Sequence, residues 1–208
     1  MKRWAYGVWW LLLLAILVWS GIRPYDRFTW VLEVLPIFAG IPLLAASQRS
    51  YPLTPLLYWL ILVHAAVLAV GGKYTYANVP VGYMVQHLMG WQRNPYDRLG
   101  HFFQGLVPAI LAREIYLKLQ VVQGKRWLFF LVCCTCLAFS ACYEFFEWWT
   151  AVAQGSAADA FLGTQGDVWD TQWDMFMALV GSIVGQLVLA RWHDRQIAGL
   201  GKTEKKRR

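Results

Sequence analysis

The stretch WAYGVWWLLLLAILVWSGI, residues 4–22, decides the class of fold. A helix needs about 20 apolar residues, at 1.5 Å per residue, to cross roughly 30 Å of hydrocarbon. Five further apolar runs of similar length follow, at residues 30–46, 53–72, 99–119, 127–149 and 171–192. No small-residue cleavage pattern follows the first run, so we expect a retained helix and not a secretory signal. The sequence therefore predicts an all-α, polytopic membrane bundle of about six transmembrane helices.

The composition and the placement of charge support a membrane protein. Of the 208 residues, 58% are hydrophobic and 15% are charged, whereas an ordinary soluble domain carries about 25% charged residues. If the N-terminus is cytoplasmic, 14 of the 19 Lys and Arg residues fall on the inner side, which predicts that both termini are cytoplasmic. Topology and a basic tail then account for the net charge of +7. We accordingly expect no nucleic-acid partner.

We expect one integral membrane domain, residues 1–192, followed by a basic cytoplasmic tail, residues 193–208. In the sixth run, GSIVG places Gly181 and Gly185 one turn apart, a pattern of small residues that lets membrane helices pack closely. His64, deep in the third run, is expected to be a packing residue with its hydrogen bonds satisfied. His193 is expected to be solvated in the tail.

Acidic residues gather at the predicted outer face of the membrane. The last outer loop, roughly residues 150–174, contains no Lys or Arg. The start of the fourth run, the end of the fifth and the start of the sixth all meet at this face, because short loops join antiparallel neighbours. Each of the three carries two polar residues one helical turn apart: Asp97 and His101, Glu144 and Glu147, and Asp170 and Asp174. The sequence therefore predicts one outward-facing acidic pocket.

Helix capping alone would explain some of these carboxylates. Asp97, Asp170 and Asp174 fall near helix N-termini, where free backbone N–H groups and the helix dipole favour anions. Glu144 and Glu147 fall at a C-terminus, where the dipole disfavours anions and two like charges repel. A cation, a shared proton or a histidine must offset their charge. This glutamate pair is the strongest indication of function in the chain.

The residue types in the pocket favour a hard or borderline metal. One imidazole with several carboxylates and no usable thiolate suits zinc, manganese, iron or magnesium. The candidate ligands are His101, Glu144, Glu147, Asp170 and Asp174, and either glutamate is a candidate catalytic base in a metal-assisted reaction. Asp97 and Asp167 are further candidates, and Arg98 at the rim could hold an anionic headgroup. Without a metal, a carboxylate pair with separated pKa values could carry out general acid/base catalysis.

The tetrapeptide Pro-Tyr-Asp-Arg occurs twice, at residues 24–27 and 95–98. Both copies fall just before an apolar run on the outer side. In both we expect the proline to begin a helix, the tyrosine to lie in the interfacial aromatic belt and the aspartate to cap the helix. Only the second copy leads to a histidine within one turn.

Three motifs carry a resemblance to a known family: NPYDRLGHFFQG (94–105), CYEFFEWW (142–149) and FLGTQGDVWDTQWDM (161–175). Through these motifs, the chain resembles the YjdF-like family of bacterial inner-membrane proteins, and the resemblance covers most of its length. The resemblance implies a multi-pass protein of the inner (plasma) membrane and supplies no reaction. A fainter similarity is to the VanZ-like membrane proteins, in which Lys, Gln and Asn stand at the places of Arg98, Glu147 and Asp174. That similarity suggests a role with cell-envelope lipids.

We therefore expect an inner-membrane protein whose outward-facing site binds or acts on a lipid or lipid-linked headgroup, with a divalent metal as candidate cofactor. Membrane lipids are the expected partners, and the sequence indicates no protein partner. A transporter or proton-coupled channel is an alternative, which would need ionisable groups near the bilayer midplane. A non-catalytic membrane adaptor is another. The sequence does not decide whether the protein is an enzyme.

Overall fold

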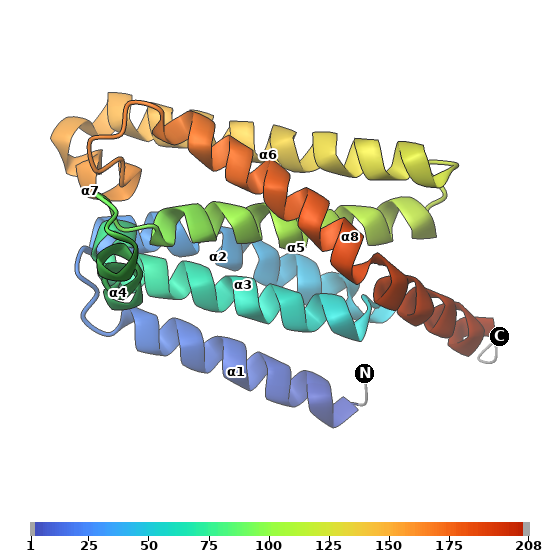
Figure 1. The fold of residues 1–208 in the computed structure, drawn as a ribbon. Coiled ribbons are helices and arrows are strands. Elements are labelled where there is room, and N and C mark those ends of the chain that lie inside the picture. Colours follow the sequence, from blue (N-terminus) through green and yellow to red (C-terminus); the bar gives the residue numbers. More distant parts are fainter. Residues whose placement is uncertain (1–2, 206–208) are drawn as a thin grey trace.

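The computed structural model describes residues 3–205, and within that range it is all-helical, without a β-strand. Six long helices form a bundle (Figure 1): α1 (Arg3–Gly21), α2 (Arg27–Ser50), α3 (Pro55–Tyr74), α5 (Tyr96–Lys118), α6 (Lys125–Gln154) and α8 (Asp170–Lys205). Each overlaps one of the six predicted runs. Five of them, all except α5, are long and apolar enough to cross a membrane. The predicted bundle of about six membrane helices is confirmed.

Helix α5 is the long helix that is not apolar enough to count as a membrane span by composition, and its position explains how it can cross the membrane. It packs against α3, α6 and α8 and is the central helix of the bundle. Its charged residues Asp97, Arg113 and Glu114 are buried, as is His101. Charged groups are tolerated at membrane depth where protein and not lipid surrounds them. The sequence pattern that weakens α5 as a membrane span therefore marks it as the core.

Helix α8 crosses obliquely over α5, and glycines allow the two backbones to touch (Figure 1). A Cβ atom added at Gly105 would lie 1.8 Å from the carbonyl oxygen of Ala178, and one at Gly181 would lie 2.0 Å from that of Phe102. No side chain fits in such a space, so the close packing predicted from GSIVG is confirmed. The crossing also sets the distance between residues one turn farther out, His101 on α5 and Asp174 on α8.

Four short helices lie at the end of the bundle away from both termini (Figure 1): η1 (Tyr76–Asn78), α4 (Pro80–Met89), η2 (Gly155–Ala158) and α7 (Asp159–Leu162). Figure 1 shows α4 nearly end-on, so its axis crosses those of the long helices. Its exposed side chains are mostly apolar: Val81, Tyr83, Met84, Val85, Leu88 and Met89. A helix with this orientation and surface suits the membrane interface. The sequence patterns that we used predict only a loop here.

At the opposite end, Glu114 joins three helices. Its carboxylate accepts hydrogen bonds from the backbone N–H and hydroxyl of Thr54 (3.0 and 2.7 Å) and from Nζ of Lys118 (2.6 Å). His193 of α8 places Nε2 2.9 Å from the same carboxylate and is fully buried. The expectation that His193 is solvated is wrong, because α8 continues as a helix through Trp192. Residues 206–208 of the predicted tail lie outside the described range.

The two Pro-Tyr-Asp-Arg copies have different roles. In the first, Tyr25 is exposed, and Asp26 caps α2 by accepting the backbone N–H of Thr29 at 2.7 Å, as predicted. In the second, Tyr96 is buried and donates its hydroxyl to the carbonyl of Val67. Asp97 lies inside the first turn of α5 and makes no capping bond. The expected capping hydrogen bond of Asp97 is therefore missing, although its place in the first turn suits the helix dipole. Another partner must account for its burial.

Candidate functional site

His101 lies at the centre of a ring of carboxylates contributed by α5, α6 and α8. Its Nε2 atom is 3.6 Å from Oδ1 of Asp97 and 3.7 Å from Oδ2 of Asp174. Its Nδ1 atom is 3.9 Å from Oε1 of Glu144 on the other side of the ring. The four side chains are each at least nine-tenths buried. The predicted convergence of the three helices on His101 is present in the structure.

Several polar atoms in this ring have no hydrogen-bond partner among the described residues. They are Nδ1 of His101, Oε1 of Glu144 and Oδ1 of Asp174. A buried polar atom without a partner is destabilising by about 1–3 kcal/mol, so native structures rarely keep one without a reason. The separations of 3.6–3.9 Å around His101 are too long for direct hydrogen bonds. The arrangement is suited to a group that enters between these side chains.

A metal ion is one such group, and Asp97, His101 and Asp174 have the right spacing for it. One ligand atom from each of the three lies within 4.8 Å of the others. Ligand atoms about 2.0–2.2 Å from a tetrahedral zinc ion are about 3.3–3.6 Å apart, and the two carboxylate oxygens lie 3.6 and 3.7 Å from Nε2 of His101. Glu144 faces the other ring nitrogen, where carboxylates commonly orient a metal-binding histidine. The position of Glu144 therefore fits the orientation of His101 better than direct coordination of the metal.

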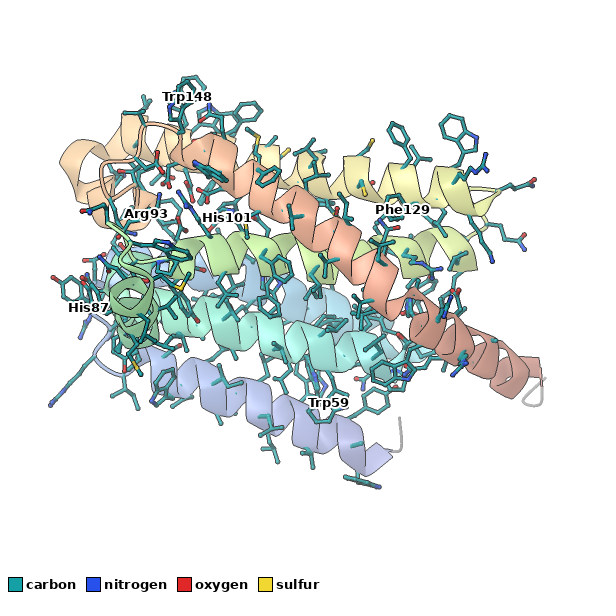
Figure 2. All side chains as sticks on the ribbon, in the orientation of Figure 1. Trp59, His87, Arg93, His101, Phe129 and Trp148 are labelled. Atoms are coloured by element: carbon teal, nitrogen blue, oxygen red, sulfur yellow. The ribbon has the colours of Figure 1, made fainter. Side chains whose placement is uncertain are left out.

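Arg93 holds the outer side of the ring together. Its guanidinium contacts Oδ2 of Asp97 at 3.0 Å, Oδ2 of Asp167 at 3.4 Å and Oδ1 of Asp170. Figure 2 shows Arg93 and His101 at the same end of the bundle. Because Arg93 takes Oδ2 of Asp97, the Oδ1 atom is left facing His101. Asp97 is only four positions from Arg93, but Asp167 and Asp170 come from a segment more than 70 positions away. Only the fold brings that segment near, so the sequence did not indicate that Arg93 joins the three carboxylates.

Arg98 also belongs to this outer network. It donates to Oδ2 of Asp167 at 2.9 Å and lies over the ring of Trp173, 4.8 Å from its centroid. A hydrogen bond from the backbone N–H of Trp169 lowers the pKa of Asp167, and the charges of Arg93 and Arg98 lower it further. Burial would lower the pKa of Arg93, but the neighbouring Asp170, together with the charges of Asp97 and Asp174, outweighs this effect and raises it. Both arginines are thus already paired with carboxylates.

A large cavity of about 520 Å³ opens beside His101. It runs between α2, α3, α5 and α6, and Asp97, His101 and Glu147 line its outer end. Farther in, the walls are mostly apolar, with Pro108, Leu111, Ala112, Ile115 and Phe139. The volume is within the range of about 300–1,000 Å³ that is typical of ligand pockets. The acidic ring is therefore the polar end of a ligand-sized space.

Two ionisable residues in this cavity escaped the sequence reasoning. Glu33 of α2 is buried and lines the cavity, and so does His64 of α3, whose Nε2 atom has no partner. The expectation that His64 is a satisfied packing residue is wrong. An isolated acid inside an apolar run was the available signal for Glu33, since such residues usually mark a functional position in membrane helices.

The predicted site residues divide into three groups. Asp97, His101, Glu144 and Asp174 form the ring, and Glu147 lines the cavity next to it. Asp167, Asp170 and Arg98 lie in the network around Arg93. Among the residues of the ring, the outer end of the cavity and the Arg93 network, the acids outnumber the guanidinium groups of Arg93 and Arg98. These acids are Glu33, Asp97, Glu144, Glu147, Asp167, Asp170 and Asp174. The excess of acids favours a cation.

Comparison with known proteins places this fold and site in a family. Residues 5–195 match the family described as "Predicted membrane protein (DUF2238)". The chain belongs to this family. Over 191 residues, 92% of this chain and 91% of the relative, it is 56% identical to "Inner membrane protein YjdF" of Escherichia coli (strain K12). No solved structure matches the chain.

Membership of the DUF2238 family confirms the resemblance read from the three motifs. It also confirms the location: the chain is a multi-pass protein of the bacterial inner membrane. The family and its E. coli member are described as membrane proteins, without a reaction. Any activity must therefore be argued from the site.

Proposed function

We propose that the outer end of the bundle is a divalent-cation site that binds, and acts on, the headgroup of a membrane lipid or lipid-linked molecule. The single observation that supports this most is the position of the His101 ring at the polar end of an apolar cavity inside the membrane. A ligand that fills such a space has a polar head and an apolar body. Lipids are the abundant molecules of this kind in a membrane.

Asp97, His101 and Asp174 are the proposed ligands of the cation. Glu144 would orient the imidazole through Nδ1, and Arg93 would orient Asp97 through Oδ2. A cation there would polarise a phosphoryl or acyl oxygen of the headgroup and activate a water molecule. Glu147 lines the cavity beside the ring and is the proposed general base. In this scheme Asp170, paired with Arg93, supports the site from outside.

Metal analysis of the purified protein tests the cation site. We expect about one zinc, manganese, iron or magnesium ion per chain in the wild type, and a loss of most of it in His101→Ala and Asp174→Asn. His87→Ala is a matched control, because His87 is an exposed histidine on α4, away from His101 (Figure 2). A wild-type protein without bound metal, or equal metal content in all variants, would rule out the cation site.

Turnover of lipids tests the reaction. Envelope lipids incubated with the metal-loaded protein should release a water-soluble headgroup or a fatty acid. The Glu147→Gln protein should retain the metal but release neither product. If lipids stay intact although the metal binds, the site is a binding site only.

A second function, proton-coupled transport, is favoured by Glu33 and His64. Both line the cavity, and His64 lies near the middle of α3, where a transporter would have ionisable groups. Proton flux into liposomes that contain the protein tests this alternative. The transport hypothesis requires a proton flux that Glu33→Gln and His64→Ala each reduce strongly. The headgroup reaction requires no proton flux, in the wild type or in either variant.

A further inference from the structure

We infer that the cavity is a lateral chamber that takes up one acyl chain of an outer-leaflet glycerolipid from the bilayer, between α2 and α6. This inference deepens the proposed function. It rests on that function in one respect, the binding of the headgroup at the His101 ring. The acyl chain would lie along α5, its ester group beside His64 and Tyr143, and its head at the His101 ring.

The length of the chamber fits a lipid chain. On α5 its lining residues recur every three or four positions, so that they form one stripe along the helix: Asp97, Gly100, His101, Gln104, Pro108, Leu111, Ala112, Ile115 and Tyr116. From the first to the last, the helix rises by about 28 Å at 1.5 Å per residue. Below the charged end, from Gln104 to Tyr116, the rise is about 18 Å, close to one leaflet's half of the roughly 30 Å hydrocarbon core. A chamber of this shape suits an extended chain and not a compact solute.

The polarity of the walls changes along that length in the way that a lipid requires. The outer third has Asp97, His101 and Glu147, whereas the inner half has Leu111, Ile115 and Phe139. Two hydroxyls in the inner half, of Tyr116 and Thr135, are hydrogen-bonded to each other. An acyl chain has no polar atom that needs a partner, so the inner half can hold it without an unsatisfied group. The charged end would hold the phosphate or other polar head through the cation.

Between these two ends, the chamber has polar atoms without partners. They are Nε2 of His64, Oε1 of Gln104 and the hydroxyl of Tyr143. An imidazole N–H and a phenol O–H can donate to ester oxygens, which lie just below the headgroup in an acyl lipid. A plain hydrocarbon chain would leave these buried groups unpaired, at a cost of about 1–3 kcal/mol each. The walls therefore fit an ester-linked chain better than an isoprenoid chain.

The chamber is closed toward the outer solution and open toward the lipid. Phe161 of α7 is 3% exposed, and its ring packs against those of Tyr143 and Phe146, while α7 also contacts α2. This contact covers the chamber between α2 and α6 from outside. In contrast, Pro36, Phe139 and Cys142 line the chamber and are exposed on the side of the bundle. Access to the chamber is therefore from the bilayer.

Photocrosslinking in lipid nanodiscs tests the chamber. The probe is a phosphatidylglycerol with a diazirine near the end of one acyl chain, and the crosslinked residues are mapped by mass spectrometry. We expect the main adducts on Leu111 or Ile115, in several-fold excess over lipid-facing residues such as Phe130 and Leu187, which are exposed and do not line the chamber. Adducts confined to lipid-facing residues would overturn the inference.

A matched pair of variants on α6 controls for folding. Cys142 and Cys134 are both free, exposed cysteines, and only Cys142 lines the chamber. Cys142→Trp should narrow the chamber and reduce the chamber adducts several-fold, whereas Cys134→Trp should leave them unchanged. Equal adducts in both variants would contradict a chain in the chamber. Asp174→Asn should lose the metal and keep the adducts, so a failed metal site and a failed chamber can be told apart.

Discussion

Asp174 of α8 places its Oδ2 atom 3.7 Å from Nε2 of His101 on α5, although 73 positions separate the two residues in the sequence. The contact depends on the crossing of the two helices one turn farther in, where Gly105 meets the backbone of Ala178. A metal site needs its ligand atoms within about 0.2 Å of fixed distances. The glycine crossing is therefore part of the site as well as part of the fold.

A methyl group at the crossing should disturb both stability and metal binding. In Gly105→Ala the new Cβ would lie 1.8 Å from the carbonyl oxygen of Ala178, so the helices must separate. We expect a loss of about 1–3 kcal/mol, as for other overpacked cores, and a lower metal content. Thermal unfolding in detergent and metal analysis measure the two effects.

The control for this change is Gly40→Ala, because a Cβ at Gly40 of α2 meets no atom within 4 Å. Alanine is the better helix former by about 0.5–1 kcal/mol, so this variant should be as stable as the wild type or more stable. Full metal content and unchanged stability in Gly105→Ala would show that the helix spacing does not set the site.

Removing Arg93 should loosen the outer end of the bundle. The side chain is 11% exposed and serves Asp97, Asp167 and Asp170, so Arg93→Ala leaves three carboxylates without their shared partner. Breaking a buried ion pair on one side costs about 3–5 kcal/mol. We expect a strongly reduced melting temperature. Arg93→Lys keeps the charge but not the planar fork of donors, so it should restore only part of the stability. Equal melting temperatures in all three proteins would contradict the bridging role.

The last outer loop should respond to acid through Asp167. Its pKa is lowered in the folded protein by the N–H of Trp169 and by the two arginines. A carboxyl with a lowered pKa contributes stability above its unfolded pKa of about 3.9, and this contribution is lost as the pH falls through the lower, folded pKa. The protection of residues 163–169 against hydrogen exchange, relative to the unstructured rate at each pH, should therefore be high at neutral pH and fall only below about pH 4.

Asp167→Asn is the control for this pH dependence, because it removes the titrating group and keeps the size of the side chain. Its loop should exchange faster at neutral pH and show a smaller change on acidification. If wild type and variant respond identically to acid, other carboxylates control the loop.

Local sequence patterns were sufficient for the parts of the molecule that local physics decides. The six apolar runs follow from the thickness of the bilayer, and the glycine pair in GSIVG indicates a close helix contact. The convergence of Asp97, His101, Glu144 and Asp174 follows from short loops between antiparallel helices. The convergence needs only that helices adjacent in the sequence pack side by side.

The features that sequence reasoning missed depend on lateral packing. Arg93 has partners from a segment more than 70 positions away, and His193 is buried only because α8 continues past Trp192 to meet Glu114. Glu33 and His64 matter because α2 and α3 flank the same cavity. A single sequence contains no signal for such neighbours, since an apolar helix can present the same face to lipid or to protein.

Two glutamates at opposite ends of the bundle should respond oppositely to the same substitution. Glu114 is fully buried, and Thr54, Lys118 and His193 all contact its carboxylate. Glu114→Gln leaves these three polar or cationic partners without their anion. We expect a loss of about 3–5 kcal/mol, as for one-sided removal of other buried charge pairs. Glu144 is also buried, but its Oε1 atom has no partner.

Glu144→Gln removes one negative charge from a cluster in which carboxylates outnumber cations. Relief of that repulsion should leave the metal-free protein as stable as the wild type or more stable, as is common when a functional site is neutralised. The same variant should bind metal about 10–100-fold more weakly, because the orienting partner of His101 is weakened. Melting curves of both variants with and without chelator measure the contrast. If Glu144→Gln destabilises the metal-free protein as much as Glu114→Gln does, the outer glutamate is a structural residue, and the ring around His101 is held together for the fold and not for a cation.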